Sequence, residues 1–132
     1  MTRQAIIPTD VKEAAEALNM SPGIVSGGHL FLTGVTGSGP KGEMPNETET
    51  QFRNAFKKIG LVLDTAGVDF DAVVEMTSYH IGLRQHFDLF DKVRSEVFTA
   101  PTPAWTAIEA AGLRRKGAVV EIRVIAYIGT ET

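Results

Sequence analysis

One carboxylate in the sequence stands where it could serve as a general base. Glu121 lies between Val120 and Ile122 in the apolar segment 118–128, and carboxyl groups that are partly buried among apolar neighbours hold a proton more readily than exposed ones. Such a group can accept a proton from a water molecule near neutral pH. An ion pair with Arg123, two residues along on the same strand face, is the structural alternative for this side chain.

A tryptophan and three arginines are candidates for ligand binding. Trp105 can stack on a planar molecule and donate one hydrogen bond, although packing at a subunit interface explains the same residue. The cations that could bind an anionic group are Arg3, Arg84 and Arg123, of which Arg123 is the first choice. A solvated surface position is the alternative for each arginine.

The histidines show no pattern typical of a metal site. His29, His80 and His86 share no spacing that would place them on one helix face or on adjacent strands. We therefore expect no metal and no cofactor, and we retain only His80 as a candidate ligand contact. Four glycines loosely resemble a phosphate-binding loop: Gly34, Gly37, Gly39 and Gly42. Because no Lys-Ser/Thr pair or helix start follows them in the required place, tight turns explain them better.

The composition favours one soluble domain spanning residues 1–132. Apolar residues make up 43% and charged residues 22% of the chain, and cysteine is absent, which excludes disulfides and thiolate chemistry. The net charge is -3 and the only basic cluster is the short run 114–116, so nucleic acid is not an expected partner. The beginning of the chain lacks the apolar core of a signal peptide, and no run reaches the ~20 apolar residues of a membrane helix. A cytoplasmic protein without a membrane partner is expected.

Two segments have the apolar period of a helix. Residues 47–66 and 83–98 each carry an apolar stripe at helical spacing, and Pro101 prevents the second from continuing. Thr48 with Gln51 has the spacing of a capping box, and Asn46 with Glu49 is an alternative. Gly67 is a suitable left-handed stop for the first helix.

Strand periodicity indicates a sheet that two helices can cover on one face only. The expected strands are 3–7, 29–34, 72–81, 104–111 and 118–128, and residues 10–22 form a short insertion, helical or irregular in 10–19. The face without helices would present Val119, Ile125, Tyr127 and Trp105, which a partner subunit would cover. A monomer whose second face tolerates water is the alternative.

Three segments, in this order and at about this spacing, resemble the RidA/YjgF family, also called the endoribonuclease L-PSP family. They are 31–34 (FLTG) with 40–45 (PKGEMP), 66–67 (AG) with 71–79 (DAVVEMTSY), and 103–107 (PAWTA) with 120–122 (VEI). The resemblance implies an α+β chorismate-mutase-like (YjgF) fold: a mixed β-sheet with two helices on one face. It also implies a homotrimer formed through the other face, with small-molecule clefts between subunits.

The resemblance further implies an activity and the residues that carry it. Family members hydrolyse reactive enamines and imines, and Glu121 matches the glutamate thought to position the attacking water. The arginine that holds the substrate carboxylate corresponds here to Trp105, whose indole offers one donor and no charge. We therefore do not expect standard 2-aminoacrylate deaminase activity. Two further departures lie at cleft positions: Gly23 replaces a tyrosine, and Ile81-Gly82 replaces Thr-Asp.

Three functions remain open from the sequence. The first is a hydrolase for an imine, an enamine or a related nitrogen metabolite, with Glu121 orienting water and Thr33 and Gly34 contacting an oxyanion-like centre. The second is a non-catalytic module that binds a small metabolite in the same cleft. The third is an endoribonuclease or translation inhibitor, which the acidic balance supports least.

Overall fold

The computed structural model describes residues 2–129. Strands, helices and short 3-10 turns (η) follow one another along the chain. In order they are β1 (Gln4–Ile6), η1 (Thr9–Val11), α1 (Lys12–Leu18), β2 (Gly23–Ser26), β3 (His29–Leu32), β4 (Val35–Thr36), α2 (Thr48–Thr65), η2 (Phe70–Ala72), β5 (Val73–His80), α3 (Leu83–Val97), β6 (Ala104–Glu109) and β7 (Val120–Tyr127). The chain is thus an α+β protein, as its sequence predicts.

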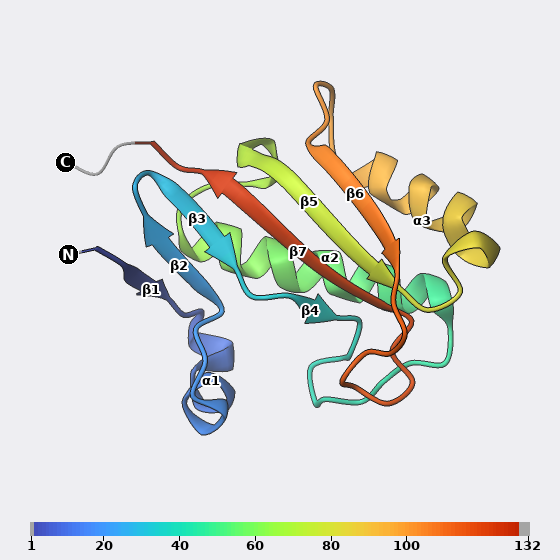
Figure 1. Cartoon of the computed structure of the whole chain (residues 1–132). Coiled ribbons are helices and arrows are strands. Elements are labelled where there is room, and N and C mark those ends of the chain that lie inside the picture. Colours follow the sequence, from blue (N-terminus) through green and yellow to red (C-terminus); the bar gives the residue numbers. More distant parts are fainter. Residues whose placement is uncertain (1, 130–132) are drawn as a thin grey trace.

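The strands form one mixed sheet in the order β1-β2-β3-β7-β5-β6, with β4 also pairing with β7 (Figure 1). All pairs are antiparallel except β5 with β6, which are parallel. A parallel pair needs a crossover connection, and α3 provides it. The mixed sheet predicted from the sequence is confirmed, and β6 is the edge strand beside α3 (Figure 1).

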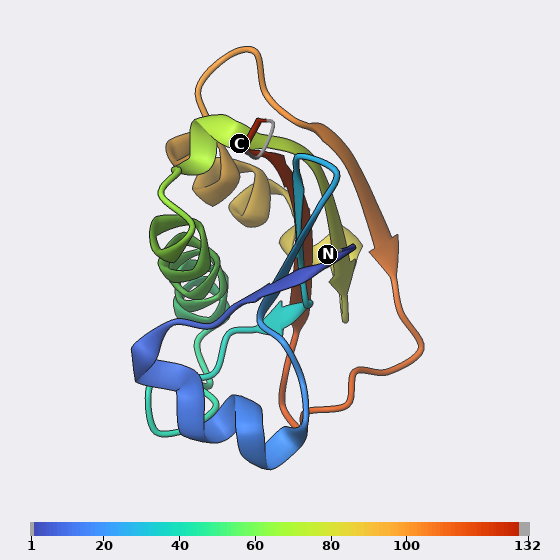
Figure 2. The same ribbon diagram turned by 90° about the vertical axis from the view of Figure 1, so that its left-hand side faces the viewer.

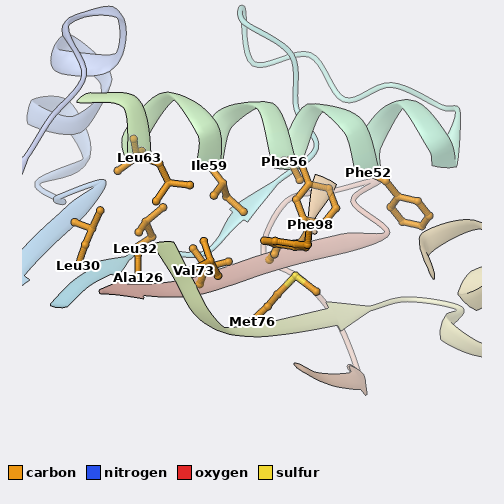
Figure 3. Packing of buried hydrophobic residues seen from close by; sticks show 14 of the residues in the cluster. Leu30, Leu32, Phe52, Phe56, Ile59, Leu63, Val73, Met76, Phe98 and Ala126 are labelled. Carbon is orange, nitrogen blue, oxygen red and sulfur yellow. The ribbon is translucent and has the colours of Figure 1, made fainter. Parts of the chain in front are cut away.

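Helices α2 and α3 lie on the same face of the sheet (Figure 2). The apolar stripe of α2 packs down onto the strands, with Phe52, Phe56, Ile59 and Leu63 all at most 3% exposed (Figure 3). These positions recur at three or four residues, which places them on one side of a helix. The period seen in the sequence therefore marks the buried side of α2.

The start of α2 differs from the predicted capping box. Glu47 is the N-cap residue and no side chain caps the helix. Gln51, only 1% exposed, uses its amide elsewhere: Nε2 donates to the carbonyls of Pro45 and Gly117, and Oε1 accepts from the Val119 N–H. Both capping pairs were wrong: a long-range tether takes the side chain of Gln51, and the carboxylate of Glu49 accepts from Arg53 instead. The stop at Gly67 is confirmed, with φ of +82°.

Two strands were not predicted, and one residue lies on the other face from the one expected. β2 and β4 are short, and the insertion at 10–22 contains the regular helix α1. Trp105 pairs in register with Met76, a core residue, so its side chain points toward the helices. Its predicted place on the uncovered face was wrong, because the register of β6 against β5 fixes the side on which it lies.

No helix covers the second face of the sheet among residues 2–129 (Figure 2). Phe31, Ile108 and Tyr127 expose 38%, 42% and 50% of their surface. The described helices include none with the length and apolarity needed to cross a membrane.

Candidate functional site

A pocket of about 340 Å³ opens around Glu121. Its lining comes from the ends of several strands and from the loop between β6 and β7. The residues are Gly34, Tyr79, Ala110, Gly112, Leu113, Arg114, Glu121 and Arg123. Glu121, Gly34 and Arg123, all singled out in the sequence, therefore meet in one pocket.

Strand register brings these side chains together. Glu121 of β7 pairs with Tyr79 of β5 on one side and with Thr36 of β4 on the other. Arg123, two residues along β7, points to the same face because side chains alternate along a strand. That face is opposite to α2 and α3, since the alternate residues Val120, Ile122 and Val124 are buried in the core.

The contact of Glu121 with Gly34 depends on the missing side chain of the glycine. A Cβ atom on Gly34 would meet the Glu121 carboxylate, so only glycine leaves the carboxylate in this place. The neighbouring Thr33 is engaged elsewhere: its hydroxyl donates to the Ser21 carbonyl at 2.6 Å. Thr33 is therefore not brought into the pocket lining.

The charged groups of the pocket form no ion pairs with one another. Within residues 2–129 the ion pairs involve only Arg53 and Arg94 as cations. The pair of Glu121 with Arg123, considered from the sequence, is thus not formed in this part of the chain. The pocket offers one carboxylate that can accept from a ligand or water, together with two guanidiniums, Arg114 and Arg123, that suit an anionic group.

Trp105 lies away from this pocket, between β6 and α3. Its ring stacks on Phe87 with centroids 5.6 Å apart, and the guanidinium carbon of Arg94 lies 4.4 Å from the centre of its ring. The indole Nε1 donates to Ser78 Oγ at 2.9 Å. These contacts lie within one chain, so they are neither the subunit-interface packing nor the ligand contact considered from the sequence.

His80 is also on the helix side of the sheet and is fully buried. Its Nε2 lies 2.7 Å from Ser78 Oγ, and its Nδ1 lies 2.9 Å from Nε2 of His86. Burial, then the neighbouring His86, lowers the pKa of His80 to about 4. A buried, neutral imidazole of this kind does not reach the Glu121 pocket.

The other arginines are separate from Glu121 as well. Arg84 lines a second pocket, of about 600 Å³, at the start of α3. There the Glu109 carboxylate accepts from the N–H groups of Gly82 and Leu83, which lowers the pKa of Glu109. Arg3 is exposed just before β1. Residues 2–129 contain no group of three or more side chains placed to hold a metal.

Comparison with known proteins places this geometry in a family. The profile of the Endoribonuclease L-PSP family matches residues 11–128. The chain belongs to this family. It is 34% identical over 127 residues to the RutC family protein YjgH of Escherichia coli K12, covering 96% of this chain and 95% of that protein. The three-dimensional comparison agrees with this assignment. A solved structure of a protein named YJGH superposes on the chain with a TM-score of 0.89 at 32% identity, covering 99% of this chain and 100% of that one.

A structure of RidA from the Antarctic bacterium Psychrobacter sp. is also similar, with a TM-score of 0.77, 28% identity and coverage of 82% and 87% of the two chains. The expectation that Trp105 stands in place of a ligand-binding arginine stays a prediction. The structure directs that side chain toward Ser78 and Phe87. The cations that line the pocket, Arg114 and Arg123, come instead from the β6–β7 loop and from β7.

Sequence reasoning missed Tyr79, Arg114 and the polar partners of His80. Alternation along β5 would have put Tyr79 on the face opposite to Ser78 and His80, which is the only signal available for it. Arg114 lies in a loop, where no period indicates the direction of a side chain. His86 meets His80 only through the packing of α3, which a spacing of six residues does not disclose.

Proposed function

We propose that the protein is a homotrimer that binds a small anionic nitrogen compound at the Glu121 pocket and hydrolyses its imine or enamine group. The observation that carries this proposal is the Glu121 carboxylate, which forms no ion pair in the described chain and shares its pocket with Arg114 and Arg123. Membership of the Endoribonuclease L-PSP family supports a pocket of this kind.

The chemistry assigned to each residue follows from charge and position. Arg114 and Arg123 hold the anionic group of the substrate by charge-assisted hydrogen bonds. Glu121 accepts a proton from a water molecule while the water oxygen attacks the imine carbon. In an acyclic imine the nitrogen takes up a proton and leaves as ammonia, so that the C=N bond and one water become a C=O bond and ammonia. An enamine first takes a proton on carbon to become the imine, and a cyclic imine opens to an amine and a C=O bond.

The uncovered sheet face supports assembly with further copies of the chain. Phe31, Ile108 and Tyr127 are large side chains exposed on a sheet that no helix of the described chain covers on this side. Burying such a face against other subunits removes apolar surface from water. The Glu121 pocket opens on the same face, so in this proposal a neighbouring subunit completes its wall.

Two measurements test the proposal. Sedimentation should give a mass near three times the 14.3 kDa of one chain. Ammonia release should be assayed with freshly generated 2-aminoacrylate and with acyclic imine carboxylates, and ring opening to the amino-carbonyl product with cyclic imine carboxylates. We expect turnover of at least one imine and little of 2-aminoacrylate. A trimer that binds these compounds without releasing product would support a metabolite-binding module in place of a hydrolase. A monomer at all concentrations would remove the neighbouring wall of the pocket.

A further inference from the structure

Four polar side chains form a continuous hydrogen-bonded chain in the core between the sheet and α3. It runs from Trp105 on the edge strand β6, through Ser78 and His80 on β5, to His86 on α3. Ser78 and His80 are both 0% exposed. Phe52 and Phe90 pack edge-on against the imidazole of His80, and Phe52 also packs against His86. These hydrogen bonds thus join three elements, β6, β5 and α3, across an otherwise apolar layer.

Trp105 sets the direction in which protons are donated along these hydrogen bonds. An indole N–H can only donate, so Ser78 Oγ accepts from it. Within residues 2–129 the other hydrogen bond of Ser78 Oγ is with His80 Nε2, which must therefore receive the hydroxyl proton. His80 then carries its own proton on Nδ1 and donates it to Nε2 of His86. Every link, together with the hydroxyl proton of Ser78, is satisfied only when both imidazoles are neutral, with Nε2 unprotonated on each.

We propose that this hydrogen-bonded chain is an acid-sensitive latch, in which a proton added to Nε2 of His86 weakens the connection between α3 and the edge strand β6. The added proton turns the acceptor at Nε2 into a donor that faces the Nδ1–H of His80. The contact survives only if His80 moves its proton to Nε2, and Ser78 Oγ then faces two donors. Ser78 Oγ can accept from both, but its own hydroxyl proton then has no acceptor in the described chain, so the buried network loses one hydrogen bond whichever way it rearranges.

The surroundings favour the neutral form of the latch. Burial lowers the pKa of His86 below its ordinary 6.5, and burial followed by His86 lowers that of His80 to about 4, while Glu109 opposes both shifts. Arg94, paired with Asp91, lies over the indole at the other end of the chain. Phe52 on α2, Phe87 and Phe90 on α3, and Val120 on β7 also adjoin the latch and carry no charge.

The direction of the pH effect follows from these shifts. Between pH 6.5 and about 4 the unfolded chain binds more protons at these two histidines than the folded chain does. The free energy of unfolding contributed by the latch is therefore fully present above pH 6.5 and falls as the pH drops through this window. His86 is the more exposed of the two and takes the first proton.

Trp105 is the only tryptophan in the sequence, so its fluorescence and its indole N–H resonance report on the end of the latch directly. The test follows both signals from neutral pH down to about pH 4, with far-UV circular dichroism as a measure of the fold. We expect a change at Trp105 below pH 6.5 while the circular dichroism stays constant. Tryptophan and backbone signals that change together would show ordinary acid unfolding and overturn the proposal.

A pair of variants assigns the effect to the latch. His86→Gln keeps a side-chain oxygen that can accept from His80 but does not titrate in this range, so the Trp105 transition should disappear while the fold persists. His29→Gln is the matched control, because His29 lies beside Phe31 and Tyr127, outside the latch. An unchanged transition in His86→Gln, or its loss in His29→Gln, would contradict the proposal. If His86→Gln does not fold, the wild-type protein decides the matter. An indole N–H resonance that keeps one position from neutral pH to about pH 4 would contradict the proposal.

Discussion

The carboxylate of Glu121 lies directly against the backbone of Gly34. A Cβ atom on Gly34 would be 2.6 Å from Glu121 Oε2, 3.2 Å from its Cγ and 3.3 Å from its Cδ. Real Cβ atoms do not approach other atoms to the first of these distances, so the carboxylate and a side chain at residue 34 exclude one another. The position of the proposed general base is thus set by a residue of the loop between β3 and β4.

Gly34→Ala should displace the Glu121 carboxylate and lower imine turnover by about 10- to 100-fold. The unfolding free energy should change by less than about 1 kcal/mol, because the clash is with the end of a flexible side chain. Gly112→Ala is the matched control: Gly112 also lines the pocket, but an added Cβ meets nothing within 4 Å. Equal activity losses in the two variants would show that the contact with Glu121 is not the cause.

Glu121→Gln keeps the volume of the side chain and removes its charge. Since Glu121 has no ion-pair partner in residues 2–129, its loss leaves no cation unpaired there, and the melting temperature should stay within a few degrees of wild type. Turnover should fall by about 10²- to 10⁴-fold, the usual contribution of a general base. A large drop in melting temperature with unaltered ligand affinity would instead identify a structural carboxylate.

Trp105→Arg should destabilise the protein without creating a carboxylate-binding site at the Glu121 pocket. The substitution removes the stacking on Phe87 and places a second guanidinium beside Arg94, which we expect to cost about 2–4 kcal/mol in urea unfolding. Adding Arg94→Gln should restore part of that loss by removing the like charge. Efficient 2-aminoacrylate hydrolysis by Trp105→Arg would show that residue 105 reaches the ligand after all.

Gln51→Leu tests the tether between the start of α2 and the loop before β7. Two carbonyls and one N–H lose their partner, at a cost of about 3–5 kcal/mol of unfolding free energy. Thr48→Ala, three residues earlier, should cost less than about 0.5 kcal/mol because no side chain caps this helix. Equal effects of the two variants would favour the capping box that the sequence suggests.

Lys58 should react with amine-acylating reagents at an unusually low pH. Its Nζ donates to Ser38 Oγ at 2.9 Å, and burial, then the charge of Arg115, lowers its pKa to about 8. The neutral amine is the reactive form, so its rate of acylation should rise with a midpoint near pH 8. Peptide mapping can compare it with the exposed Lys57 beside it on α2. A midpoint near the ordinary lysine value of 10.5 would contradict this prediction.

The sequence was most informative where a period repeats over many residues. The stripe that includes Phe52 and Leu63 predicted α2, and alternation around Glu121 predicted which residues share a face of β7. β4 has only two residues, too few for any period. Trp105 could not be placed because β6 alternates little in polarity, and its pairing with β5 decides the face. The capping box failed because a partner 66 residues away, Gly117, competes for the same amide.

The place of β7 in the sheet has a consequence for synthesis on the ribosome. β7 pairs with β3, β4 and β5, yet it follows all of them in the chain. Until residues 120–127 emerge from the exit tunnel, the growing polypeptide holds two sheet fragments with unpaired edges, and α2 lacks the central strand on which it rests. Residues 2–119 are therefore translated before the core can close, and the unpaired strand edges are open to aggregation during that interval.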